Sequence, residues 1–453
     1  MICEITEIDK VKFLKTELVK ISQKEKHFYI GKIPARHFLK LYTVEPAEYD
    51  IEKHTALASE FSDDSEYYSY LIGEDRKRID DKAFQRKENE TRIKEISQFL
   101  SKESFALFPN SIIITCDLLN DYLDATYSDF NFSIAKLSDK YKGLSYLEKK
   151  DDKYYLYTPY KNNTLLIIDG QHRIKGIENS SEEIINNYEL LVSLIIEYDR
   201  SAVAKLFYTI NYTQKSVNKS LLYHLTGEFS HELNEITFMH EMVKILNELD
   251  QSPFHKRIKM LGDVPKGLEP EDKERLSISQ AFLIDYLKGT ISKSSIKSLH
   301  QPIFLYYFKN SELQIEIIRF IIRYFSAIKE IKRADWDNPK NSIICKTISI
   351  GAFIKVLHFL FAKIFIEEFK GKPAAIKELS TETLKDYLKG IQNIDFSNDS
   401  PFAGVASGGS LNKLKEVIIQ KMDYFEGDSY KDFLKIFKNR YLEPFKAWNE
   451  KNL

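Results

Sequence analysis

The chain has 453 residues, of which 43% are hydrophobic and 29% are charged, and its formal net charge is -1. This length predicts two domains, and the balanced charge excludes the overall basic excess of a general nucleic-acid binder but leaves room for a local basic groove. The three cysteines, Cys3, Cys116 and Cys345, form no CxxC pair, which excludes a zinc ribbon or a disulfide framework and favours reduced thiols.

Up to about residue 225 the sequence predicts strands and helices in mixed order. β-Branched and aromatic runs predict the strands, and apolar residues at helical spacing predict the helices. The polar, acidic stretch 47–78 predicts a loop or a family-specific insertion. Strands are expected at Phe28–Ile33, Ser111–Cys116, Leu165–Ile168 and Tyr188–Tyr198, and helices at Ala35–Leu41, Thr91–Leu100, Gln171–Ile177, Asp199–Ile210 and in a segment that ends at Leu225.

Beyond residue 225 the sequence predicts one helix after another. The most apolar segment, Ile348–Ile366, is interrupted by Lys355 and Lys363, so we expect a buried helix and no membrane span. Because Glu4 and Glu7 come too early for a signal peptide, we expect a soluble, cytoplasmic protein. The expected helices are His231–Leu249, Ser279–Leu287, Glu312–Lys332, Thr347–Phe369, Ile376–Ile391, Leu411–Met422 and Tyr430–Trp448.

These two patterns predict an α+β protein. An α/β domain is expected at residues 1–225 and a mostly α-helical domain at residues 226–453.

The segment Asp169-Gly170-Gln171-His172-Arg173 lies where a buried strand meets the first turn of a helix. Amide groups at a helix start have no partner within the helix and lie at the positive end of its dipole, so anions bind there. Gly170 lets the backbone approach a ligand, and Arg173 offers a planar cation suited to phosphate oxygens. Gln171 can orient a water, and His172 can transfer a proton near neutral pH. Asp169 can hold Mg²⁺, act as a general base or cap the helix.

A purely structural interpretation of the same segment is equally open. Asp169 would then be only a helix cap, His172 a satisfied structural histidine and Arg173 an exposed ion-pair partner. The residue types alone leave the two interpretations even.

Other polar residues could complete a phosphate site. Gln85 and Arg86 precede a predicted helix and could add a phosphate contact or belong to a solvated face. Asn211, Gln214 and Lys215 follow another predicted helix and could close over a ligand or satisfy the backbone of a turn.

Asn110 follows Pro109 and is most simply a turn residue. A small basic cluster is either solvated surface or a contact for DNA phosphates; it comprises His255, Lys256, Arg257 and Lys259. The sequence contains no GxSxG, HExxH or Walker A motif, and no set of ligands with zinc-site spacing.

The run LLIIDGQHRIKGI resembles the diagnostic motif of DGQHR-domain proteins, which include the DndB-like proteins of DNA phosphorothioation systems. Five further segments look like the same family in the same order, so that the resemblance covers about residues 28–262. They are FQR (Phe84–Arg86), RIKEISQFL (Arg92–Leu100), FPNSIII (Phe108–Ile114), LFYTINYTQKSVNKSL (Leu206–Leu221) and SPFHKRIKMLG (Ser252–Gly262).

This resemblance implies a first domain similar to the ParB/sulfiredoxin superfold, whose relatives bind or hydrolyse nucleotides. It implies a place in bacterial DNA-modification and phage-defence gene clusters. One branch of the family resembles transcriptional regulators of phosphorothioation genes, and another is associated with 7-deazaguanine insertion and linked to ATP hydrolysis. By motif match, the resemblance implies a nucleotide site made of Asp169, Gly170, Gln171, His172 and Arg173, joined by Gln85, Arg86, Asn110, Asn211, Gln214 and Lys215.

Two functions therefore stay open, and we favour the first. It is a nucleoside-triphosphate hydrolase that supports DNA modification, with ATP or another triphosphate and Mg²⁺ as cofactors and Asp169 as the Mg²⁺ ligand. The second is a DndB-like, DNA-binding regulator that contacts phosphates through the basic cluster, and a nuclease is a third interpretation. The expected partners are DNA and other proteins of the gene cluster, with no membrane contact and with a homo-oligomer as an open alternative.

Overall fold

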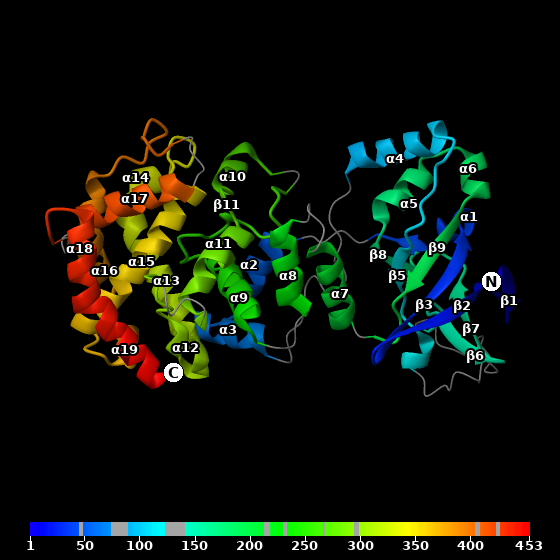
Figure 1. Cartoon of the computed structure of the whole chain (residues 1–453), viewed down its shortest axis with the longest axis horizontal. Coiled ribbons are helices and arrows are strands. Elements are labelled where there is room, and N and C mark those ends of the chain that lie inside the picture. Colours follow the sequence, from blue (N-terminus) through cyan, green and yellow to red (C-terminus); the bar gives the residue numbers. More distant parts are fainter. Residues whose placement is uncertain are drawn as a thin grey trace. The chain divides into compact units, whose positions relative to one another are not determined.

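The chain divides into two compact units in the computed structural model (Figure 1). The sheet unit comprises Met1–Glu48 and Asp80–Gln214, and the helical unit comprises Tyr49–Ile79 and Lys215–Leu453. The predicted α+β class is confirmed. The structure describes residues 1–44, 49–73, 89–122, 141–198, 200–212, 218–229, 233–265, 268–293, 299–403, 408–422 and 426–453.

The sheet unit is built on a mixed sheet, which has nine strands in the described part of the chain. The strand order is β4-β8-β5-β9-β3-β2-β7-β6, and β1 pairs with the first half of β2, residues 11–16. The pairs β4·β8 and β5·β9 are parallel, and the others are antiparallel. The strands are β1 Cys3–Ile8, β2 Val11–Gln23, β3 Lys26–Pro34, β4 Tyr42–Thr43, β5 Ile112–Thr115, β6 Tyr146–Lys150, β7 Lys153–Pro159, β8 Leu165–Asp169 and β9 Glu189–Leu194.

The core of this sheet follows the alternation of buried residues along each strand. Leu14, Thr16 and Leu18 of β2 are buried on one face because successive side chains of a strand point to opposite sides. The β8 run predicted to be central is confirmed as a strand between β4 and β5, and Leu165 and Ile167 are fully buried.

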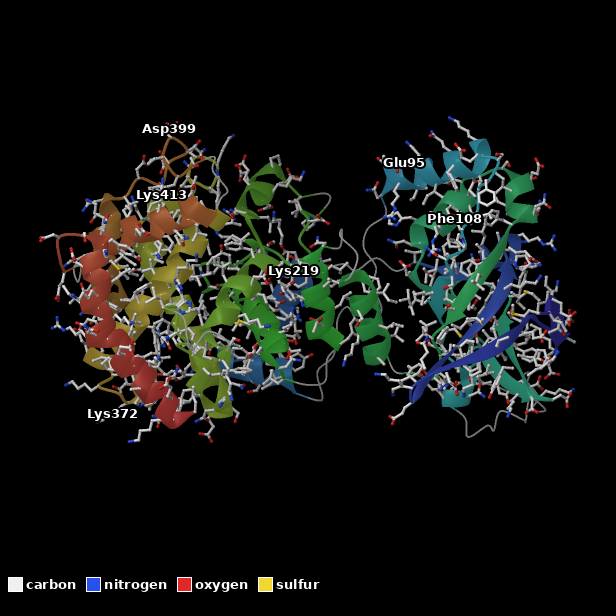
Figure 2. The ribbon with its side chains drawn as sticks, viewed as in Figure 1. Glu95, Phe108, Lys219, Lys372, Asp399 and Lys413 are labelled. Carbon is white, nitrogen blue, oxygen red and sulfur yellow. The ribbon has the colours of Figure 1, made fainter. Side chains whose placement is uncertain are left out.

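Helices flank this sheet, and all of them except the short α6 lie where the sequence predicted a helix. They are α1 Ala35–Phe38, α4 Glu90–Lys102, α5 Gln171–Glu178, α6 Glu182–Asn187 and α7 Arg200–Tyr212. Helix α4 buries Ile93 and Leu100 and packs on α5, where Gly176 makes room for Ile96. Figure 2 labels Glu95, which is exposed on α4, and Phe108, whose ring contacts Phe99 of the same helix.

The prediction of a loop within 47–78 was wrong for its described part. Helices α2 Ile51–Ala58 and α3 Asp64–Ile72 occupy this segment and belong to the helical unit. Asp50 and Asp63 cap them, each by accepting hydrogen bonds from two backbone amides. The segment is polar because only one narrow face of each short helix is buried, which is why it resembled a loop.

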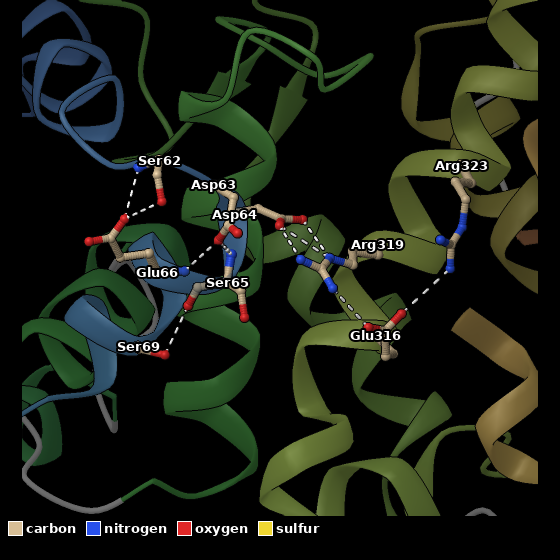
Figure 3. Close-up of polar contacts among 9 residues, drawn as sticks. All are labelled: Ser62, Asp63, Asp64, Ser65, Glu66, Ser69, Glu316, Arg319 and Arg323. Carbon is tan, nitrogen blue, oxygen red and sulfur yellow. Dashed lines mark hydrogen bonds and ion pairs between the residues drawn. The ribbon is translucent and has the colours of Figure 1, made fainter. Parts of the chain in front are cut away.

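A network of ion pairs connects α3 with the long helix α13 Gln314–Ile331 (Figure 3). Asp64, of which 11% of the side chain is exposed, accepts hydrogen bonds from Arg319 Nε and Nη2 at 2.6–3.1 Å. Arg319 Nη1 also donates to Glu316 at 2.9 Å. The segment 49–73 is therefore an integral part of the helical unit and interrupts the sheet unit in sequence.

The helical unit contains the helices predicted in the second half of the chain, but two of them are divided. The segment Tyr430–Trp448 was predicted as one helix but forms α18 Tyr430–Phe437 and α19 Glu443–Asn452, which are joined by the π-helical segment Lys438–Leu442. The segment Ile376–Ile391 was predicted as one helix but forms α16 Thr381–Leu388 between two 3₁₀ turns. The remaining elements are α8 Lys219–Phe229, α9 Glu235–Glu248, β10 Ile258–Lys259, α10 Pro270–Arg275, β11 Ile278–Ser279, α11 Gln280–Leu287, α12 Leu305–Lys309, α14 Arg333–Trp336, α15 Thr347–Glu367 and α17 Gly408–Lys421.

Helix α15 confirms the prediction of a buried apolar helix. It is the one described helix that is long and apolar enough to cross a membrane, and 89% of its most apolar window is buried within the protein. The ring of Phe361, in the middle of α15, contacts the rings of Phe320 and Phe445 from other helices. It is therefore the centre of the helical unit's own core.

Candidate functional site

The Asp-Gly turn begins where β8 ends. Asp169 is the last residue of β8, Gly170 has φ +106° and ψ 7°, and α5 starts at Gln171. The Gly170 carbonyl accepts hydrogen bonds from the amides of Arg173 and Ile174, at 3.0 and 3.1 Å. The predicted strand-to-helix turn is therefore confirmed, and the chain reverses at a residue in the left-handed region.

Gly170 is required by space as well as by backbone conformation. A Cβ atom placed on it would lie 2.6 Å from Cδ1 of Ile112 on β5 and 3.1 Å from Nη2 of Arg173. The turn therefore sits directly against the neighbouring strand, and a side chain here would push α5 away from it.

We expect Gly170→Ala to destabilise the region around β5 and α5 by about 2–4 kcal/mol, from left-handed strain plus overpacking. Gly371→Ala is the matched control, because Gly371 also has a positive φ, +74°, but a Cβ atom placed on it would have no described atom within 4 Å. It should cost about 1 kcal/mol. Amide hydrogen exchange measures the local stability around each glycine separately. Equal losses of protection around Gly170 and Gly371 in the two variants would contradict the steric argument.

Arg173 connects α5 to the segment before β5. Its Nη1 donates to the carbonyl of Asn110 at 2.6 Å, and its Nη2 donates to the carbonyl of Ser111 at 3.0 Å. Nη2 also lies 3.5 Å from Oδ2 of Asp169, and 17% of the Arg173 side chain is exposed. Burial lowers the pKa of Arg173 from its ordinary value, although Asp169 opposes this effect. The guanidinium is therefore held mainly by backbone oxygens.

His172 and Gln171 are largely buried in the first turn of α5, with 8% and 7% of their surfaces exposed. The amide of Asn89 donates to Nε2 of His172 at 3.3 Å. Asn89 is also the N-cap of α4, and its side chain accepts a hydrogen bond from the amide of Arg92. His172 thus links the starts of two helices.

Asp169 is the most accessible charged group of the motif, with 30% of its side chain exposed. Among the described residues its ion-pair partner is Arg173, at the long distance of 3.5 Å. Its carboxylate lies beside the start of α5, where the helix dipole favours negative ligands. A carboxylate in this position can bind a cation or a water while the adjacent amides bind an anion.

The structure places the other predicted phosphate ligands as follows. Asn110 lies next to the motif, but it contributes its backbone carbonyl to Arg173, and its residue surface is exposed. Asn211 lies in α7, although its side chain is outside the described part of the structure. Gln85, Arg86, Gln214 and Lys215 lie outside the described residues.

The predicted basic cluster is not one exposed patch. Lys256 donates to both carboxylate oxygens of Glu52, at 2.6 and 2.7 Å, and His255 lies 3.3 Å from Asp250. Arg257 is only 8% exposed, and its guanidinium lies 5.9 Å from the centre of the Trp336 ring. Lys259 belongs to β10 and is half-buried.

Two participants in the motif's contacts were missed by the sequence reasoning. They are the amide of Asn89 and the carbonyl of Ser111, and both act through the backbone. No residue type at these positions signals such a contact, since every non-proline residue carries the same groups.

The chain matches a protein-family model. Residues 17–261, more than half of the chain, match the model of the DndB family, which is described as DNA-sulfur modification-associated. No curated protein matches the chain. No solved structure matches it. The matched residues include the whole β8–α5 turn, and the chain belongs to the DndB family of DNA-sulfur modification-associated proteins.

Proposed function

We propose that this protein is a cytoplasmic, nucleotide-binding component of a DNA phosphorothioation system and that it hydrolyses ATP. The observation that carries this proposal is the position of Asp169. Its partly exposed carboxylate ends a buried strand, one residue before a positive-φ glycine and a helix start. A strand–glycine–helix turn of this kind presents backbone amides to phosphate groups. We include in the proposal that the sheet unit is related to the ParB/sulfiredoxin superfold.

The motif residues divide into two roles in this proposal. Gly170 and the amides at the start of α5 receive the phosphate oxygens, and Asp169 orients the attacking water through a carboxylate oxygen. His172 and Arg173 hold the turn rigid through the backbone groups of Asn89, Asn110 and Ser111. Gln171, which is buried, would order a water only inside the turn.

The donor set fits Mg²⁺, and Asp169 would hold the ion together with phosphate oxygens of the nucleotide. Mg²⁺ commonly uses one or two protein carboxylates together with phosphate oxygens, and Asp169 supplies one such carboxylate. When bound, the ion would supply positive charge beside the transferred phosphoryl group.

The regulator is the alternative function in the same pathway. It requires a free basic surface for DNA phosphates. Of the four residues predicted for that surface, Lys256 and His255 have acidic neighbours and Arg257 is buried, so we rank the regulator second. DNA and other proteins of the gene cluster are proposed partners in either case.

A nucleotide screen on the purified full chain tests the proposal. Calorimetry would measure binding of ATP, GTP and CTP with Mg²⁺, and phosphate release would measure hydrolysis, each with and without duplex DNA. We expect binding of at least one triphosphate and release of phosphate. Absence of both, combined with salt-dependent DNA binding in a gel-shift assay, would reject the enzyme and favour the regulator. The duplex DNA in these assays would be a supercoiled plasmid, and nicking of it would favour the nuclease.

A further inference from the structure

Two histidines and a glutamate meet in the interior of the helical unit, far in sequence from the Asp-Gly motif. His224 and Glu228 lie one turn apart on α8, and His240 lies on α9, which packs against α8. One ligand atom from each of the three lies within 4.8 Å of the others. Their exposed fractions are 2%, 3% and 0%.

The polar contacts of this cluster leave one imidazole nitrogen unsatisfied. Glu228 Oε1 lies 3.2 Å from His240 Nε2 and accepts a hydrogen bond from Lys244 at 2.9 Å. Nδ1 of His224 is buried and has no hydrogen-bond partner among the described residues. A buried polar atom without a partner costs free energy, so its presence in a native core calls for a ligand or another function.

Gln280 is placed to orient His240. Its amide nitrogen lies 2.5 Å from His240 Nδ1, and its Oε1 is buried without a partner in the described part of the chain. Turning the amide over would let Oε1 accept a hydrogen bond from Nδ1–H, which leaves the lone pair of Nε2 directed toward Glu228. Histidines that bind metals commonly donate their second ring N–H to a carbonyl or carboxylate in this way.

The imidazole of His240 packs directly against the backbone of α8 at Gly227. A Cβ atom on Gly227 would lie 2.0 Å from Cδ2 and 2.2 Å from Cγ of His240. Glycine at this position therefore lets α9 bring His240 to the side chains of α8.

The buried charge of Glu228 also suits a cation. Glu228 and Lys244 are both 3% exposed, and they form an ion pair at 2.9 Å. A divalent cation beside the same carboxylate would further stabilise this buried negative charge. Glu228 Oε1 faces His240 Nε2 and has two lone pairs, so it can bind the ion and keep its hydrogen bond from Lys244.

We propose that His224, Glu228 and His240 form a binding site for a divalent transition metal of the Zn²⁺ class that stabilises the packing of α8 on α9. Two imidazoles and a carboxylate are a ligand set that suits zinc. The three residues would supply three of the four ligands of a tetrahedral site, with a water as the fourth, and their near-complete burial assigns the metal a structural role. This site is independent of the nucleotide site, because it lies within the helical unit.

Metal analysis of the untagged full chain, purified without chelator, tests this site. We expect about one zinc ion per chain by mass spectrometry, or uptake of added Zn²⁺ after dialysis. Co²⁺ in place of zinc should give the visible absorption of a tetrahedral site. A chelator should lower the unfolding temperature, followed by fluorescence of Trp336 and Trp448, which are the two tryptophans of the chain and lie in the helical unit.

Matched variants separate metal binding from simple loss of a core histidine. His224→Asn should abolish zinc uptake and make the unfolding temperature insensitive to chelator. His358→Gln, at another buried histidine of the same unit, should keep both the zinc and the chelator response. If His224→Asn cannot be purified, Glu228→Gln serves the same purpose. No zinc uptake by the wild type, or equal uptake by His224→Asn, would overturn the proposal.

Discussion

Asp169→Asn is expected to lower the rate of ATP hydrolysis about 100-fold or more, since a positioned carboxylate typically contributes that much to proton transfer or water orientation. Asparagine has nearly the same shape, so the turn at Gly170 should persist. The long contact with Arg173, at 3.5 Å and 30% exposure, contributes only about 0–1 kcal/mol to stability. The variant should therefore stay folded and lose activity.

Glu178→Gln is the control for this experiment. Glu178 lies at the other end of α5, where it pairs with Lys175 at 3.0 Å and accepts a hydrogen bond from Tyr42. The same exchange of carboxylate for amide on the same helix should leave hydrolysis within about 2-fold of the wild type, because it is a surface change away from the turn. Unchanged turnover in Asp169→Asn would reject the role assigned to Asp169, even if the protein is an ATPase.

Acidification from pH 6.5 to 5 is expected to destabilise the helical unit by about 1.5 kcal/mol for each of two buried histidines. Burial lowers the pKa of His358 to about 3 and that of His300 to about 4, and neighbouring Lys355 contributes in the same direction. His358 is 4% exposed and donates from Nδ1 to the carbonyl of Gln301 at 2.7 Å. The two rings are 5.2 Å apart, and Lys415 also acts on His300.

The sign of this effect follows from proton binding. Between pH 6.5 and 5 both histidines are neutral in the folded protein, whereas in the unfolded chain they bind protons with a pKa near 6.5. The unfolded state thus binds more protons, and the free energy of unfolding falls as the pH falls. Below the folded-state pKa values the histidines contribute no further dependence.

Urea unfolding followed by tryptophan fluorescence at pH 7, 6 and 5 measures this dependence. His358→Gln keeps a donor for the Gln301 carbonyl and removes one titrating group, so it should remove about half of the two-histidine contribution to the slope. The difference between variant and wild type cancels the carboxylates that titrate in both. Equal slopes would show that His358 does not determine the acid sensitivity.

The sequence determined the local framework of the proposed site. A continuous apolar run predicts a strand buried on both faces, and Asp-Gly predicts the turn that ends it, so β8, Gly170 and α5 were found at their true positions. The long helices were predictable for a similar reason, because apolar residues at helical spacing recur over many turns in α13 and α15.

Short or strongly turned segments were not predictable in this way. The hairpins β1–β2 and β6–β7 turn at Asp9-Lys10 and Asp151-Asp152, which have positive φ without any glycine. Helices α2 and α3 are short and polar, and contacts such as Asp64 with Arg319 join residues 255 positions apart.

The tertiary structure alone decided what the charged side chains do. Arg173 has the chemistry of a phosphate ligand, but in the folded chain its guanidinium binds the carbonyls of Asn110 and Ser111. His224 and Glu228 are four residues apart in the sequence, so any helix places them on one face. His240 lies beside them only because α9 packs closely on α8 at Gly227. Local structure follows from local residue patterns, but the partner of a polar side chain depends on which distant backbone or side-chain groups the packing brings within hydrogen-bonding reach.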